Sequence, residues 1–113
     1  MIIISAEITI PSEKRAAAIE GSKPFQQATR DDEPGCQEYI FTIDPCRDDI
    51  IHVYELWDDA ETLAAHFEHE NYFKMREFLG AAGITGAIST KFRIDAHAPV
   101  YGPDGVATSN FEA

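Results

Sequence analysis

Apolar and polar residues alternate along four stretches of the chain, and these stretches are rich in β-branched and aromatic residues. This period of two predicts β-strands at residues 2–10, 36–44, 50–58 and 86–95. Two longer stretches repeat apolar residues at helical spacing instead. They predict helices at residues 13–30 and 60–83.

The order of these elements, β-α-β-β-α-β, predicts an α+β fold of the ferredoxin-like type. In that fold a four-stranded antiparallel sheet carries both helices on one face. Gly21 and Pro24 predict a kink or a break in the first helix. The second helix is expected to be interrupted near residues 69–71 and to end at Gly80 or Gly83.

The predicted strand at 50–58 is largely apolar on both faces. The face that we expect to lie against the helices carries Ile51, Val53, Glu55 and Trp57. An apolar sheet face is costly to leave in water, so the opposite face predicts a homodimer in which the sheets of two copies cover each other. Residues 1–98 are predicted to form one domain, and 99–113, with two prolines and two glycines, a C-terminal tail or arm.

The charge of the chain limits its partners. Its 113 residues include 20 acidic and 9 basic side chains, for a formal net charge of -11. Nucleic acids and anionic membranes both attract concentrated Lys and Arg, so neither partner is expected. The first ten residues reach Glu7 too early for a signal peptide or a membrane span, and we therefore expect a cytoplasmic protein.

Two side chains are candidates for proton transfer. Glu55 is a carboxylate between a valine and a tryptophan on a predicted buried face, where desolvation would raise its pKa toward neutrality. A salt bridge to Arg76 or to a helix lysine would account for it equally well. His66, on the second predicted helix, titrates naturally near neutral pH. Its alternative role is that of a buried histidine bonded to a backbone carbonyl.

The stretches "DEPGCQEY" and "VYELWDDAETLAAHFEHENYFKMREFL" resemble the antibiotic biosynthesis monooxygenase family, and the resemblance extends over about residues 2–95. It implies a dimeric α+β barrel with a pocket between the sheet and the helices. It also implies oxygenation of a small phenolic or quinol substrate without a bound cofactor. Such chemistry is feasible because an electron-rich phenolate can itself reduce dioxygen once a proton is removed and water excluded.

The resemblance extends to individual residues. Trp57 matches a tryptophan that lines the family's quinone-forming pocket, and Arg76 resembles a pocket arginine that could hold a substrate oxygen. Val53 and Leu63 stand where those members carry an asparagine and a tyrosine. The predicted catalytic residues are Glu55, His66 and Arg76. The predicted ring contacts, which core packing would explain as well, are Trp57, Phe67, Tyr72 and Phe73.

Other branches of the family leave alternatives open. Isomerases that process the phosphorylated autoinducer-2 signal carry residues similar to "VYE", to His66 and to the "NY" at 71–72. An isomerase or another proton-transfer enzyme is therefore an alternative, as is a ligand-binding dimer without chemistry. The haem-degrading branch ligates the haem iron with a histidine on the second helix, and this chain has Arg76 at that position.

No metal or cofactor site is predicted. His66 and His69 have the spacing of two metal ligands, but a third ligand of matching geometry is not evident. The stretch "GAAGITGA" lacks the spacing and the lysine of a phosphate-binding loop. The expected partners are a small-molecule substrate, dioxygen and a second copy of the chain.

Overall fold

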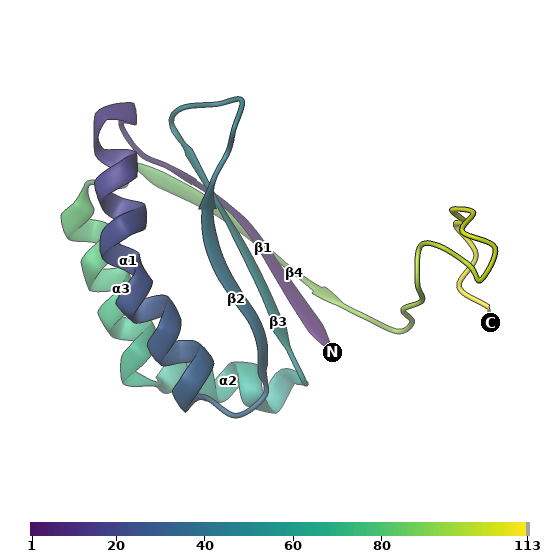
Figure 1. Ribbon diagram of the computed structural model, residues 1–113. Coiled ribbons are helices and arrows are strands. Elements are labelled where there is room, and N and C mark those ends of the chain that lie inside the picture. The colour runs from purple at the N-terminus through teal and green to yellow at the C-terminus, as the bar shows by residue number, and fades with distance from the viewer. Residues whose placement is uncertain (113) are drawn as a thin grey trace.

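A computed structural model describes residues 1–112 and confirms the predicted fold class. The elements follow in the order β1 (Ile2–Thr9), α1 (Ser12–Asp32), β2 (Cys36–Ile43), β3 (Ile50–Trp57), α2 (Ala60–Glu68), α3 (Glu70–Ala82) and β4 (Gly86–Arg93). The strands form one antiparallel sheet in the order β2-β3-β1-β4. Figure 1 shows α1 and α3 side by side on one face of this sheet, with α2 at one end. This is the ferredoxin-like arrangement.

The core lies between the sheet and the helices. Because side chains alternate across a strand, every second residue of β1 and β3 points into it. Ile51, Val53, Glu55 and Trp57 are all buried, as the sequence pattern predicts. Directly across from Glu55 lie Ile4 on β1 and Tyr39 on β2, so the acid lies on an inner strand of the helix-covered face.

Helix α1 runs from Ser12 to Asp32 without the break that Gly21 and Pro24 suggested. A Cβ atom at Gly21 would lie 2.5 Å from the ring of Phe78, so glycine allows α1 and α3 to approach closely. The same helix covers the outer edge of β2. The Gln26 side chain accepts the Phe41 N–H at 3.0 Å, and Arg30 Nε donates to the Tyr39 carbonyl at 2.8 Å. These bonds satisfy backbone groups that an edge strand would otherwise leave unpaired.

The second helical stretch is interrupted where the sequence predicts. Asp59 is the N-cap residue of its first part, α2, and the Asp59 carboxylate accepts the Thr62 N–H at 2.8 Å in a capping box. Extended backbone at His69 separates α2 from α3, and the His69 ring accepts the Asn71 N–H at 3.0 Å. Gly83, with a φ of 98°, ends α3 in the left-handed conformation.

The sheet face opposite the helices, here called the open sheet face, is uncovered within one chain and carries apolar side chains beside polar ones such as Glu7 and His52. It carries Ile3, Ile40, Tyr54, Leu56, Ile88 and Phe92. Ile88 is 75% exposed and Phe92 52%. From β4 the chain continues as an arm that projects away from the body (Figure 1) and bends back on itself at Tyr101 and Ala107. The last residue of the predicted tail 99–113 lies outside the described residues.

Over residues 1–112, none of the helices combines the length and the apolar character that crossing a membrane requires.

The turn between α1 and β2 requires glycine at position 35. Gly35 has a φ of 85°, and a Cβ atom there would lie 2.5 Å from the Thr62 side chain. We expect Gly35→Ala to lower the free energy of unfolding by about 1–3 kcal/mol, through backbone strain and this clash. Urea denaturation measures the effect. Gly80→Ala is the matched control, because its Cβ would enter open space on a helix, and it should leave the protein as stable or slightly more so.

Candidate functional site

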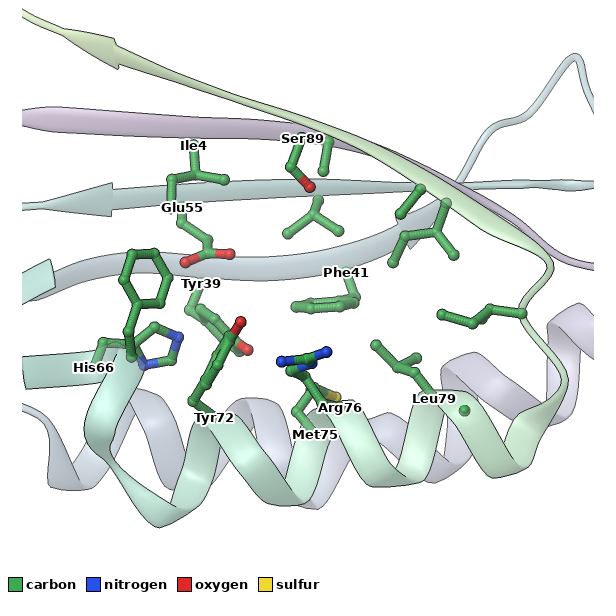
Figure 2. A pocket seen from close by; sticks show the side chains of 17 residues that line it. Ile4, Tyr39, Phe41, Glu55, His66, Tyr72, Met75, Arg76, Leu79 and Ser89 are labelled. Atoms are coloured by element: carbon green, nitrogen blue, oxygen red, sulfur yellow. The ribbon is translucent and has the colours of Figure 1, made fainter. Parts of the chain in front are cut away.

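A cavity of about 450 Å³ lies between the helix-facing side of the sheet and α3. Most of its wall is aliphatic and comes from β1, β3 and α3, including Ile4, Ala6, Ile8, Val53, Met75 and Leu79. Its polar groups gather toward the α2 end, where Glu55 points from β3 toward His66 and Tyr72 (Figure 2). The arrangement suits a molecule that is apolar over most of its length and polar at one end.

Glu55 is 8% exposed and lines this cavity. Trp57 Nε1 donates to its Oε1 at 3.0 Å, and within residues 1–112 no cation lies within ion-pair distance of it. Burial raises the pKa of Glu55 from 4.5 to about 7, the indole bond partly opposes this, and the charge of Glu33 adds to it. A carboxyl group in this state can both accept and return a proton near neutral pH.

Trp57 does not line the cavity, contrary to the sequence-based expectation of a wall position. It is fully buried and supports the site from behind. Besides its bond to Glu55, its ring packs against the His66 imidazole, with centroids 4.6 Å apart and the ring planes tilted by 34°. The indole therefore positions both candidate proton-transfer groups. The sequence identifies the residue but not this orientation, because alternation places it on the correct face without saying how far the ring reaches.

The other predicted ring contacts divide. Phe67 and Tyr72 line the cavity, with their rings 5.3 Å apart. Phe73 is 54% exposed and is not part of the wall, so it contacts Tyr72 from the solvent side only. Helical geometry explains the difference, because adjacent residues on a helix are about 100° apart and only one of the two can face the sheet.

His66 is 2% exposed and borders the cavity. Its Nδ1 lies 2.7 Å from Oε1 of Glu33, a residue that follows α1, so the bond is not to a backbone carbonyl. Asn71 Nδ2 donates to the other oxygen of Glu33 at 3.2 Å. Sequence analysis assigned no role to Glu33, and it noted Asn71 only as part of the "NY" at 71–72. Glu33 belongs to an acidic stretch, "DDEPG", that has the composition of a solvated loop, and only the tertiary fold buries it.

Arg76 lies on α3 at the open side of the cavity. Its guanidinium is 5.7 Å from the centroid of the Tyr72 ring, within reach of a cation–π contact. Among the described residues it forms no salt bridge, so the predicted pairing with Glu55 is absent. Figure 2 shows the Arg76 guanidinium directed between Tyr72 and Phe41, where it could donate hydrogen bonds to an oxygen of a bound molecule.

Tyr39 also lines the cavity, but burial raises the pKa of its phenol far above the usual range. It therefore contributes a neutral hydroxyl rather than a proton acceptor. Three or more His, Cys, Asp or Glu side chains do not come together as a possible metal site anywhere in residues 1–112. The groups that line the cavity could hold a largely apolar molecule and move a proton at its polar end.

Comparison with known proteins places this geometry in context. The family model described as "Antibiotic biosynthesis monooxygenase" matches residues 1–77. No curated protein matches the sequence. A provisionally named antibiotic biosynthesis monooxygenase from Deinococcus radiodurans has a TM-score of 0.80 at 20% identity, over 90% of this chain and 100% of its own.

Two further solved structures are similar. A protein from Caulobacter crescentus CB15, provisionally given the same name, has a TM-score of 0.74 at 18% identity, over 80% of this chain and 86% of its own. A Bacteroides thetaiotaomicron protein of unknown function, described as a possible oxidoreductase, has a TM-score of 0.71 at 24% identity, over 80% of this chain and 94% of its own. At these identities the likeness concerns the fold and leaves the reaction open.

The burial of Glu55 predicts a pH-dependent gain in stability for Glu55→Gln. The folded pKa of about 7 lies above the ordinary 4.5, so the wild type loses stability as pH rises between these values, while the neutral amide does not. Urea denaturation should show the two proteins alike near pH 4 and the variant more stable by up to about 3 kcal/mol near pH 8. The exposed Glu77→Gln, which removes the same charge, should show no such divergence. Equal behaviour of both variants would mean that Glu55 is effectively solvated.

Proposed function

The chain belongs to the antibiotic biosynthesis monooxygenase family, and from this premise we propose that it oxygenates a small phenolic or quinol substrate without a bound cofactor. The observation that carries the proposal is the placement of Glu55. A buried carboxyl group with a pKa near neutrality faces a mostly apolar cavity of about 450 Å³, a volume suited to a small ring system. Removal of a phenolic proton in an apolar site is the protein's whole chemical task if the substrate itself reduces dioxygen.

The proposed reaction converts a phenol with an unsubstituted para carbon, together with one dioxygen, into a quinone and water. Glu55 accepts the phenolic proton, and the phenolate gives one electron to dioxygen, which forms a phenoxyl radical and superoxide. The two radicals combine in a C–O bond at the para carbon, and the terminal peroxide oxygen takes the proton from Glu55. His66 Nε2 then accepts the para C–H proton as the O–O bond breaks. The departing hydroxide takes that proton and leaves as water, and the para carbon becomes the second carbonyl group of the quinone.

The surrounding residues have supporting roles in this proposal. The aliphatic wall holds the ring and excludes water, which strengthens the interactions of the few polar groups. Arg76 donates to the substrate oxygen as it becomes negative, because a guanidinium offers several N–H groups in one plane. Phe67 and Tyr72 contact the ring beside Glu55.

The same groups would also serve an isomerase, since His66 and Glu55 could move a proton between two carbons or oxygens of a metabolite. Dioxygen separates the two reactions. An isomerase consumes its substrate under anaerobic conditions, whereas an oxygenase does not. A protein that binds ligand in this cavity without turnover under either condition would be a binding module.

We also propose that the working molecule is a homodimer formed through the open sheet face. Leaving Ile88 and Phe92 in water costs about 1.5–3 kcal/mol each compared with burying them. The cavity lies on the other face of the sheet, so a second copy can cover the open sheet face without blocking it. A two-fold axis would bring the same apolar patch of each copy together.

The oxygenase proposal predicts dioxygen uptake with phenols that have an unsubstituted para carbon. In an oxygen-electrode assay over a panel of such compounds, wild type should consume about one dioxygen per substrate, and added catalase should return none, because water rather than hydrogen peroxide is the product. Glu55→Gln should lower kcat/KM by about 100-fold or more, since it removes the proton acceptor and keeps the shape.

Glu77→Gln is the control for this assay, because it changes the same chemical group at an exposed position of α3 and should leave kcat/KM unchanged. Equal rates for wild type and Glu55→Gln on an accepted substrate would remove Glu55 from the mechanism. Hydrogen peroxide as the product would show an oxidase instead of a monooxygenase.

The dimer proposal predicts that Phe92→Lys, on the open sheet face, converts the protein to a monomer. A lysine there would bring two like charges into an apolar interface. Size-exclusion chromatography with light scattering measures the molar mass. The control is Phe73→Lys, which introduces the same charge at an exposed position of α3 and should leave the dimer intact. A wild type that has the mass of a single chain at all concentrations would contradict the proposal.

A further inference from the structure

The buried carboxylate of Glu33 has no part in the proton transfers proposed above. Its side chain is 4% exposed, at the end of α1, where the Glu33 N–H donates to the Thr29 carbonyl. Charged side chains are rarely buried to this degree unless they are paired, because desolvation of an unpaired carboxylate costs several kcal/mol. The burial of this carboxylate must therefore be compensated by neighbouring hydrogen-bond donors.

Two side chains lie within hydrogen-bond distance of this carboxylate. His66 Nδ1 lies 2.7 Å from Oε1, and Asn71 Nδ2 lies 3.2 Å from Oε2. His69 Nδ1 is 4.0 Å away, but that nitrogen already accepts the Asn71 backbone N–H and so carries no proton to donate. Glu33 is thus held by one ring nitrogen and one amide, which come from opposite sides of the junction between α2 and α3.

The position of the His66 proton follows from these contacts. A carboxylate oxygen and a ring nitrogen 2.7 Å apart must have a proton between them. Burial lowers the pKa of His66, although Glu33 partly opposes this, so the ring is neutral at pH 7. A neutral ring that is protonated on Nδ1 has an unprotonated Nε2. His66 borders the cavity, and within residues 1–112 no side chain or backbone group bonds to Nε2.

The aromatic side chains around His66 restrict its rotation. The ring of Trp57 packs against the imidazole at a tilt, with the two ring centroids 4.6 Å apart. Tyr39 and Tyr72 make T-shaped contacts with it, at centroid distances of 5.6 and 5.3 Å. Glu55 stands on the strand that faces the ring across the cavity (Figure 2). The imidazole is therefore fixed in its plane by packing, while Glu33 determines which nitrogen faces the cavity as a proton acceptor.

We propose that Glu33 is a positioning residue for His66. The Glu33 carboxylate holds the His66 ring in the Nδ1–H tautomer, and Nε2 of the ring therefore faces the bound molecule as a proton acceptor. The expected effect of Glu33 on the reaction rate rests on the proposed function, whereas the predicted tautomer of His66 does not depend on it. Glu33 itself touches no substrate in this proposal. It acts through His66, as a carboxylate that orients a metal-bound or catalytic histidine does in other proteins.

The test is a two-bond ¹H–¹⁵N correlation spectrum of the imidazole groups, which distinguishes the two neutral tautomers and the charged form. The chain has four histidines, and the His66 signal is assigned by its loss in His66→Gln. Wild type at pH 7 should show His66 as the Nδ1–H tautomer. In Glu33→Gln the single amide oxygen should accept from Asn71, the NH₂ group should donate to Nδ1, and the tautomer should change to Nε2–H.

Activity gives a second measurement. Glu33→Gln should lower kcat/KM with an accepted phenol by about 10- to 100-fold, because Nε2 is then no longer an acceptor. The control is Glu68→Gln, which removes an exposed carboxylate of α2 and should change neither the tautomer nor the rate. The wild-type spectrum alone remains decisive if Glu33→Gln fails to fold.

Two outcomes would overturn the proposal. One is a wild-type His66 that is charged or protonated on Nε2 at pH 7, and the other is a folded Glu33→Gln that keeps the Nδ1–H tautomer. The expected tautomers together with no dioxygen uptake from any phenol would refute the proposed function while leaving Glu33 as the positioning residue. The two proposals can therefore fail separately.

Discussion

The site depends on the pairing register of β3. This strand is hydrogen-bonded to β1 on one edge and β2 on the other, with Glu55 opposite Ile4 and Tyr39. A slip of one residue would turn every side chain to the other face. His52 and Tyr54 would then lie under the helices, and Glu55 would lie on the open sheet face. The buried Ile51, Val53 and Trp57 oppose that slip, because each would lose its place in the core.

Two carboxylates lie near one another at the polar end of the cavity, and the protein treats them differently. Glu33 accepts two hydrogen bonds, which compensate its burial. Glu55 accepts one, from the Trp57 indole, and pairs with no cation among residues 1–112. The charge of Glu33 further disfavours ionisation of Glu55, whose pKa is raised to about 7. One acid is thereby suited to holding a histidine, and the other to exchanging a proton.

The two faces of the sheet differ in character. The helix-covered face provides the cavity, in which an aliphatic wall leads to a few polar groups at one end. The open sheet face carries exposed apolar side chains such as Ile88 and Phe92 and takes no part in the cavity. Because β1 and β3 contribute alternate residues to both faces, an association of two copies would stiffen the strand that carries Glu55 without covering it.

The sequence by itself determined the order of the elements, the face on which each β3 side chain lies, and the interruption of the second helix near His69. These features depend on local periodicity, on turn residues and on caps, which are properties of neighbouring residues. The same alternation marked Glu55 as a buried acid. It did not show that Trp57 would lie behind the cavity or that Phe73 would face solvent, because side-chain reach depends on packing between elements.

Only the tertiary structure brought Glu33 to His66, since the two lie 33 positions apart and belong to different elements. The local pattern of charge and hydrophobicity does not distinguish Glu33 from the acidic residues before it, which remain in water. The continuity of α1 across Gly21 and Pro24 was likewise decided by contacts outside the helix, with Phe78 on one side and the edge of β2 on the other. Long-range contacts of this kind leave no periodic signal in the chain, because they join residues through space rather than along the backbone.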